Sequence, residues 1–234
     1  MTKLREITTG LRFPEGPVAM SDGSVLLVEI ERGTLTRVAA DGRKEVVAQM
    51  GGGPNGAAIG PDGKCYICNN GGFKWVEDEF CLRPVLQAED YSGGRIERVD
   101  LGTGRIETLY TDTANGPLRG PNDIVFDAHG GFYFTDFGKS RARERDWGGV
   151  YYARTDGSLV REIIHPILTP NGVGLSPGGE RLYVAETETA RLWSWEIVAP
   201  GEIHKAPWPS PHGGTLVVGV GGHQRFDSLA VDGA

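Results

Sequence analysis

Short apolar runs recur in pairs along the chain, with a glycine-containing turn inside each pair. The second run of each pair lies at residues 25–28, 65–68, 132–134 or 182–185. Asp-Gly or Gly-Gly stands in the turns, as at Asp22-Gly23 and Gly178-Gly179. Such dipeptides between two strand-length apolar runs are typical of β-hairpins. The pattern therefore predicts a series of hairpins.

The first run of each hairpin repeats a short motif of a proline, a Glu or Asn, and a small residue. Its polar residue stands at position 15, 55, 122, 171 and, in a fifth copy that opens at Phe226, at 227. Further strand signals follow each of the first four hairpins, at residues 33–38, 94–99, 149–153 and 191–195, with fourth strands at 45–48, 106–110 and 159–163. Four strands in a unit of about 40–50 residues are the signature of a β-propeller blade. A sandwich of unrelated hairpins would give no reason for the motif to recur.

We therefore expect an all-β fold, a β-propeller of four-stranded antiparallel blades, as a single domain over residues 1–234. Four units carry full strand signals, and the fifth stops seven residues after Asp227. An open array of blades would leave sheet surface unpaired. We expect the complete protein to continue with the rest of blade five and one more blade, so that the C-terminal part of a six-bladed ring is missing here.

The repeated polar position carries the candidate chemistry. The first strand of a propeller blade lines the central channel, so equivalent positions point at a common axis. They hold Glu15, Asn55, Asn122, Asn171 and Asp227. All are oxygen donors, which suit a hard divalent cation, Ca²⁺ above all, with Zn²⁺, Mg²⁺ or Mn²⁺ as alternatives. The competing interpretation is that they only cap turns, which Asn fits better than the two carboxylates do.

A second set of polar residues ends the second strand of each hairpin. Its members are Glu29, Asn69, Asp136 and Glu186. We expect them either to support the first set or to contact substrate, or else to cap strand ends in solvent. Two long loops, residues 70–93 and 137–148, follow second strands and should lie on the same face. The second loop is rich in Lys and Arg, which either attract an anionic substrate or product acid or are simply solvated.

Composition narrows the function class. The chain has 36 glycines among 234 residues, roughly twice the ordinary usage of about 7%, as many tight turns require. A net charge of −7 disfavours nucleic-acid binding. The chain contains no run of 18 apolar residues, which a membrane span would require. Its first residues lack the apolar core of a signal peptide. Three cysteines give no disulfide framework, and Cys65 and Cys68 should face opposite sides of one strand. We expect a cytoplasmic protein.

The motifs together resemble the SMP-30/gluconolactonase/LRE-like family, nearest its drug-responsive lactonase branch. They read FPEGP at 13–17, GPND at 120–123, TPNGV at 169–173 and FDSLAVD at 226–232. The resemblance implies a six-bladed propeller with one catalytic divalent metal in the channel. It implies Glu15, Asn122, Asn171 and Asp227 as ligands and Asp227 as the catalytic residue. Gly120 stands where sugar lactonases often have an arginine.

The residues and the resemblance together predict a hydrolase that opens lactone rings, acting on sugar or related small lactones. Asp227 would serve as general base or as nucleophile. The candidate substrate or supporting residues are Asn55, Asp123, Glu29, Asp136, Glu186 and Ser228. Alternatives are an organophosphate or ester hydrolase at the same site, or a propeller that only binds partners. The expected partner is a small-molecule lactone; the sequence does not determine the oligomeric state.

Overall fold

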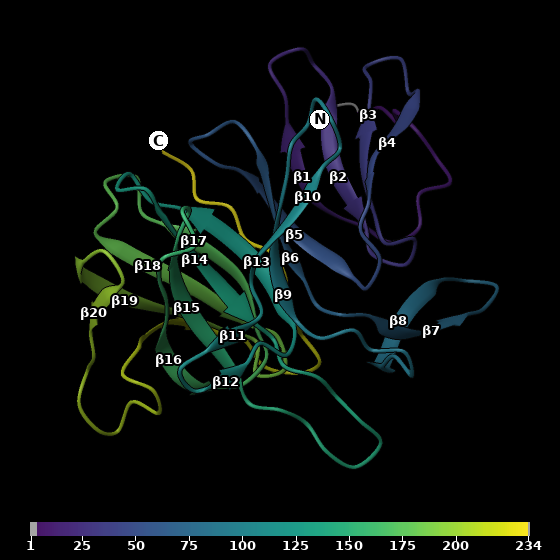
Figure 1. The fold of residues 1–234 in the computed structure, drawn as a ribbon. Helices are drawn as coiled ribbons and strands as arrows, with labels where there is room; N and C mark the ends of the chain where they lie inside the picture. Colours follow the sequence, from purple (N-terminus) through teal and green to yellow (C-terminus); the bar gives the residue numbers. More distant parts are fainter. Residues whose placement is uncertain (1–3, 234) are drawn as a thin grey trace.

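Four antiparallel sheets follow one another along the chain in a propeller-like arrangement (Figure 1). The structure is a computed structural model that describes residues 4–233. Within these residues the secondary structure is all β, with no helix, and nothing in them is helical and long enough to cross a membrane. The predicted all-β class is confirmed, and three of the four antiparallel sheets have the predicted four strands, whereas the fourth has five; a total of six blades stays a prediction.

The sheets are called blades 1 to 4 in chain order. Blade 1 contains β1 (Pro14–Ala19), β2 (Val25–Glu29), β3 (Thr34–Val38) and β4 (Lys44–Gln49). Blade 2 contains β5 (Pro54–Ile59), β6 (Cys65–Asn69), β9 (Arg95–Val99) and β10 (Ile106–Tyr110). Blade 3 contains β13 (Pro121–Phe126), β14 (Gly131–Asp136), β15 (Gly148–Arg154) and β16 (Val160–Ile167). Blade 4 contains β17 (Pro170–Leu175), β18 (Arg181–Glu186), β19 (Arg191–Ala199), β20 (Glu202–His204) and β21 (Thr215–Gly219).

Four features depart from the simple repeat. The long segment 70–93 folds into a separate hairpin of β7 (Phe73–Glu77) and β8 (Leu82–Gln87), and a short ribbon of β11 (Asp112–Thr113) and β12 (Gly116–Pro117) follows β10. In blade 4, β20 pairs with the end of β19 and β21 pairs with its beginning. The predicted fifth first strand at 226–232 is not a regular strand, although the backbone oxygen of Asp227 accepts a hydrogen bond from Gly172 N at 3.2 Å.

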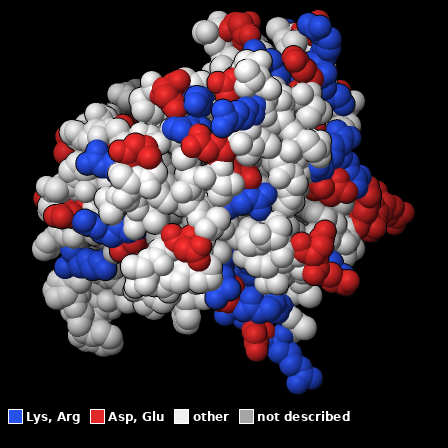
Figure 2. Space-filling view, viewed as in Figure 1, with Lys and Arg blue, Asp and Glu red and all other residues white. Residues whose placement is uncertain are grey.

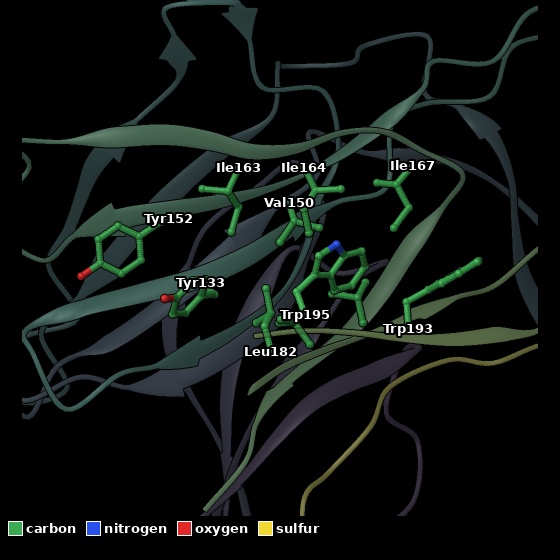
Figure 3. Packing of buried hydrophobic residues seen from close by; sticks show 11 residues of the cluster. Tyr133, Val150, Tyr152, Ile163, Ile164, Ile167, Leu182, Trp193 and Trp195 are labelled. Carbon is green, nitrogen blue, oxygen red and sulfur yellow. The ribbon is translucent and has the colours of Figure 1, made fainter. Parts of the chain in front are cut away.

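The core lies between blades, because both faces of the middle strands are covered. Phe132 and Phe134 of β14 pack toward blade 2, whereas Tyr133 between them packs with Leu182 and Trp195 of blade 4 (Figure 3). Alternate side chains of a strand point to opposite faces, so a strand buried on both faces must be apolar throughout. This explains the continuous apolar runs of the sequence.

The same alternation of side chains places Cys65 and Cys68 on opposite faces of β6. Cys65 packs in the cluster between blades 1 and 2, and Cys68 in the cluster between blades 2 and 3. Both are buried free thiols. The expectation that they face opposite sides of one strand is confirmed.

The first strands β1, β5, β13 and β17 lie side by side in this order, and glycine lets them approach. A Cβ on Gly16 would lie 2.6 Å from the backbone nitrogen of Ala57, and one on Gly56 would lie 2.6 Å from Cα of Asp123. A Cβ on Gly172 would lie 2.5 Å from the backbone nitrogen of Leu229. Each glycine follows the repeated polar residue, so the small residue of the motif is a packing requirement.

The 137–148 loop is fastened to the β7–β8 hairpin by Lys139. This side chain is 1% exposed, and its Nζ donates hydrogen bonds of 2.9 Å to Asn70 Oδ1 and to the carbonyl oxygen of Gly72. The same Nζ lies 3.9 Å from the ring centroid of Phe73. Burial lowers the pKa of Lys139 to about 7, because these contacts and the charges of Asp136 and Asp146 only partly replace water.

We predict that Gly56→Ala lowers the free energy of unfolding by about 1–3 kcal/mol, because the methyl group overlaps the backbone of β13. Gly102→Ala in the same blade is the matched control, since the nearest atom to its Cβ would be Asp100 Oδ1 at 3.6 Å. The control should change stability by less than about 0.5 kcal/mol. Denaturant unfolding measures both, and equal effects would show that the first strands do not need this close approach.

We also predict that the contribution of Lys139 to the free energy of unfolding becomes more favourable as the pH rises. Between about pH 7 and 10 the unfolded chain binds a proton at this residue that the folded protein does not. The unfolding free energy of the wild type relative to Lys139→Met should therefore increase with pH, by up to about 1.4 kcal/mol per unit. Denaturant unfolding at several pH values tests this, with the exposed Lys74→Met as control. A pH-independent difference would contradict the prediction.

Candidate functional site

The repeated polar residues of the first strands meet in one pocket of about 310 Å³. All five predicted donors line it: Glu15, Asn55, Asn122, Asn171 and Asp227. Asn122 and Asn171 are buried, Glu15 and Asn55 are half-buried, and Asp227 is exposed. Residues about 40–70 positions apart in the sequence are thus brought together, as the repeat predicted.

Local irregularity of the strands places these side chains. The pairing of each first strand with its neighbour shifts register just after the strand begins, between Glu15 and Val18, Pro54 and Ala57, Pro121 and Ile124, and Pro170 and Val173. Proline fits the first position of a strand because it donates no hydrogen bond. An irregularity of this kind re-aims the side chains beside it, and here those are the pocket residues.

One amide of the set is held in place by a neighbour. The Nδ2 of Asn171 donates to Thr187 Oγ1 at 3.2 Å, and Thr187 also lines the pocket. Within residues 4–233 the Oδ1 of Asn171 accepts no hydrogen bond. The amide oxygen therefore keeps its lone pairs available.

Electrostatic repulsion accompanies the gathering of acidic groups. The pKa of Glu15 is raised, first by burial and then by the charge of Asp227, with a smaller contribution from Asp123. A cation between Glu15 and Asp227 would relieve this repulsion. The donor set fits a hard divalent cation, because it consists of two carboxylates and three amides. Among residues 4–233 no three His, Cys, Asp or Glu side chains come close enough to hold a metal, so amides are needed to complete a site.

Asp123 stands where the other first strands have glycine, and it connects blades 3 and 4. Its Oδ2 accepts a hydrogen bond from Val173 N at 3.1 Å, and its Oδ1 accepts one from Ile124 N at 2.9 Å. Burial is the main cause that raises its pKa to about 6, and these hydrogen bonds oppose the shift. Asp123 lies beside the pocket without lining it. Ser228, also predicted near substrate, is exposed and does not line the pocket either.

The second polar set supports the pocket from behind. Each member is buried and accepts a hydrogen bond from the backbone N–H that precedes the first strand of its own blade. The pairs are Arg12 N to Glu29 at 2.8 Å, Gly53 N to Asn69 at 2.9 Å, Gly120 N to Asp136 at 2.7 Å, and Leu168 N to Glu186 at 3.0 Å. None of the four lines the pocket, so they fix its wall and leave its interior to the first set. The alternative that they cap strand ends in solvent is wrong, because all four are buried.

The pocket has walls that the repeat did not indicate. Apolar lining comes mainly from the ends of β1 and β2, the β7–β8 hairpin and the 137–148 loop, as Phe13, Ile30, Phe73, Leu86 and Phe137. Charged lining comes from Arg145, Glu188 and Arg225. The length of the two loops, which were expected on this face, indicated the part of the wall that holds Phe73, Phe137 and Arg145. No sequence signal pointed to Ile30, Glu188 or Arg225. Apart from Phe13, which opens the FPEGP segment, these lining residues lie outside the repeated motif.

Comparison with known proteins gives a consistent result. The family model for the SMP-30/gluconolactonase/LRE-like region matches residues 13–233. The chain is 32% identical over 220 residues to the lactonase drp35 of Staphylococcus haemolyticus, which covers 93% of this chain and 60% of that protein. It is 30% identical over 213 residues to the lactonase drp35 of Staphylococcus aureus strain MRSA252, over 90% of this chain and 57% of that protein. The chain thus spans about 60% of the length of these relatives.

Solved structures share the fold. A gluconolactonase from Xanthomonas campestris superposes with a TM-score of 0.65 at 21% identity, over 83% of this chain and 61% of that one. A putative gluconolactonase superposes with a TM-score of 0.64 at 21% identity, over 88% and 68%. At this level of identity the likeness concerns the fold alone. The match of the family model over nearly all of the chain shows that it belongs to the SMP-30/gluconolactonase/LRE-like family.

Proposed function

We propose that the protein is a metal-dependent hydrolase that opens lactone rings. The observation that carries the proposal is the meeting of five oxygen-donor side chains, from four first strands and the segment at Asp227, in one pocket. The relatives that match most of the chain are lactonases by name, which supports the same reaction class. A protein that only binds partners would have no need to gather mutually repelling carboxylates at its axis.

Glu15, Asn122, Asn171 and Asp227 would hold the cation, with Asn55 beside them. Oxygen ligands of this kind favour Ca²⁺ over metals that prefer nitrogen or sulfur. When bound, a divalent cation polarises a carbonyl oxygen or lowers the pKa of a water molecule. Two negative charges from Glu15 and Asp227 would balance its charge.

Asp227 is the residue to which we assign the proton transfer or the attack on the lactone carbonyl. The resemblance implies this role for Asp227, which lines the pocket together with Glu15. Its backbone is held by the hydrogen bond from Gly172 N, which fixes the segment against β17. As a general base it would take a proton from the attacking water; as a nucleophile it would form an acyl intermediate.

We predict that Ca²⁺ stabilises the folded protein through this site. At a concentration one hundred times the Kd, binding should add about 2.7 kcal/mol to the free energy of unfolding, measured by denaturant unfolding with and without Ca²⁺. Glu15→Gln should lose most of this gain, because the charge that attracts the cation is removed. The exposed Glu45→Gln is the control and should keep the full gain. An equal gain in Glu15→Gln would place the cation elsewhere.

We predict that Asp227→Asn lowers the rate of lactone hydrolysis by about 100-fold or more, while Ca²⁺ binding weakens only in part. Asparagine keeps an oxygen donor but accepts no proton at neutral pH. Activity is measured at saturating Ca²⁺ on a panel of lactones, with an ester and an organophosphate added to cover the alternative reactions. If the variant retained most of its activity under these conditions, Asp227 would have neither role.

A further inference from the structure

We propose that the substrate carries an anionic substituent, of the carboxylate or phosphate class, and that Arg145 and Arg225 bind it. This inference rests on the proposed lactone hydrolysis and names the kind of lactone. Both arginines line the pocket together with Asn171 and Asp227. Arg145 comes from the 137–148 loop, and Arg225 from the segment that leads to Asp227.

The two guanidinium groups share a single carboxylate. Arg145 Nη2 lies 3.4 Å from Glu188 Oε1, and Arg225 Nη2 lies 3.2 Å from Glu188 Oε2. Both distances are long for a charge-assisted hydrogen bond. The side chains of Arg145 and Arg225 are 37% and 67% exposed. One carboxylate therefore neutralises only one of two accessible positive charges.

Several guanidinium N–H groups of this pair remain free to bind a ligand. Arg145 uses its Nε for Ser140 Oγ and its Nη2 for Glu188. Arg225 uses its Nη2 for Glu188. Within residues 4–233, Nη1 of Arg145 and both Nε and Nη1 of Arg225 have no acceptor. Guanidinium groups bind carboxylate and phosphate through such paired donors.

The other basic residues of the 137–148 loop are not available in this way. Arg141 binds Asp146 and Gln87, and Lys139 is buried against Asn70 and Gly72. Arg143 does not line the pocket. Figure 2 shows basic side chains over the loop that protrudes at the lower edge of the molecule, yet Arg145 is the one basic residue of this loop that lines the pocket. Of the two alternatives for the basic residues of the loop, attraction of an anion thus applies to Arg145, which lines the pocket, and not to Arg143, which does not.

The balance of charge in the pocket favours an anion once a cation is bound. The cation offsets Glu15 and Asp227, and the remaining charged lining residues of the pocket, Arg145, Arg225 and Glu188, sum to one positive charge. Much of the rest of the lining is apolar, with Phe13, Phe73 and Phe137 among it. An anionic substituent on the lactone would therefore find its complement at the arginine pair.

The test compares two lactones that differ by one charge, γ-butyrolactone-γ-carboxylate and its carboxamide. The wild type should hydrolyse the carboxylate with a kcat/KM at least about tenfold higher than that for the carboxamide. This factor corresponds to the free energy of one hydrogen bond between charged groups. This preference should fall with added salt. Arg145→Gln and Arg225→Gln should each reduce the ratio of the two kcat/KM values severalfold, whereas Arg143→Gln in the same loop should leave it unchanged.

Two results would overturn the inference. One is a wild type that hydrolyses both lactones equally well, a comparison that needs no variant to fold. The other is an equal loss of kcat/KM on both lactones in the arginine variants, which would mean that Arg145 and Arg225 only hold the segment around Asp227 in place.

A separate measurement keeps this inference distinct from the proposed reaction. Calorimetric binding of the two lactones to the Ca²⁺-loaded Asp227→Asn variant should favour the carboxylate by about tenfold, and the preference should be lost when Arg145→Gln is added. If the wild type hydrolysed no lactone but this preference persisted, the reaction would fail and the anion site would stand. If lactones were hydrolysed and bound without preference, the anion site would fail and the reaction would stand.

Discussion

The close approach of neighbouring first strands is the constraint on which the pocket depends. Backbone atoms of β1, β5, β13, β17 and the segment at Asp227 come so near one another that a methyl group would not fit at Gly16, Gly56 or Gly172. Glycine has no Cβ and permits this approach. Because each glycine directly follows a polar pocket residue, the contact that joins two blades also sets the spacing of the donor side chains.

In blade 3 the contact between neighbouring first strands is made without this glycine. Asp123 replaces the glycine, and its carboxylate bridges to Val173 of β17, while Thr135 Oγ1 donates to the carbonyl oxygen of Asn171 at 2.6 Å. Hydrogen bonds of Asp123 and Thr135 thus join the inner strands of blades 3 and 4, in addition to the apolar packing between these blades. Such polar groups are costly when unpaired and specific when paired, so this junction fixes where Asn122 and Asn171 lie relative to each other.

Two polar residues of each hairpin have different roles in building the site. The polar residue of the first strand lines the pocket, and the polar residue that ends the second strand holds the backbone before that first strand. In blade 3 Asp136 accepts hydrogen bonds from Arg119 N, Gly120 N and Gly138 N, at 2.7 to 2.9 Å. A chain that carries acidic side chains toward a common axis needs such anchoring, since repulsion would otherwise move the strand ends apart. The loops above the site then add what the repeat lacks, apolar and cationic wall.

The sequence by itself determined the repeat and the features that depend on it. Strand alternation, turn dipeptides and the recurring polar position are local signals, so the four blades, the opposite faces of Cys65 and Cys68, and the meeting of Glu15, Asn55, Asn122, Asn171 and Asp227 could be predicted. Only the tertiary structure decided the β7–β8 hairpin, the burial of Lys139 beneath Phe73, the anchoring role of Glu29 and Glu186, and the sharing of Glu188 by Arg145 and Arg225. These depend on partners far away in the sequence, whose distance and burial no local pattern encodes.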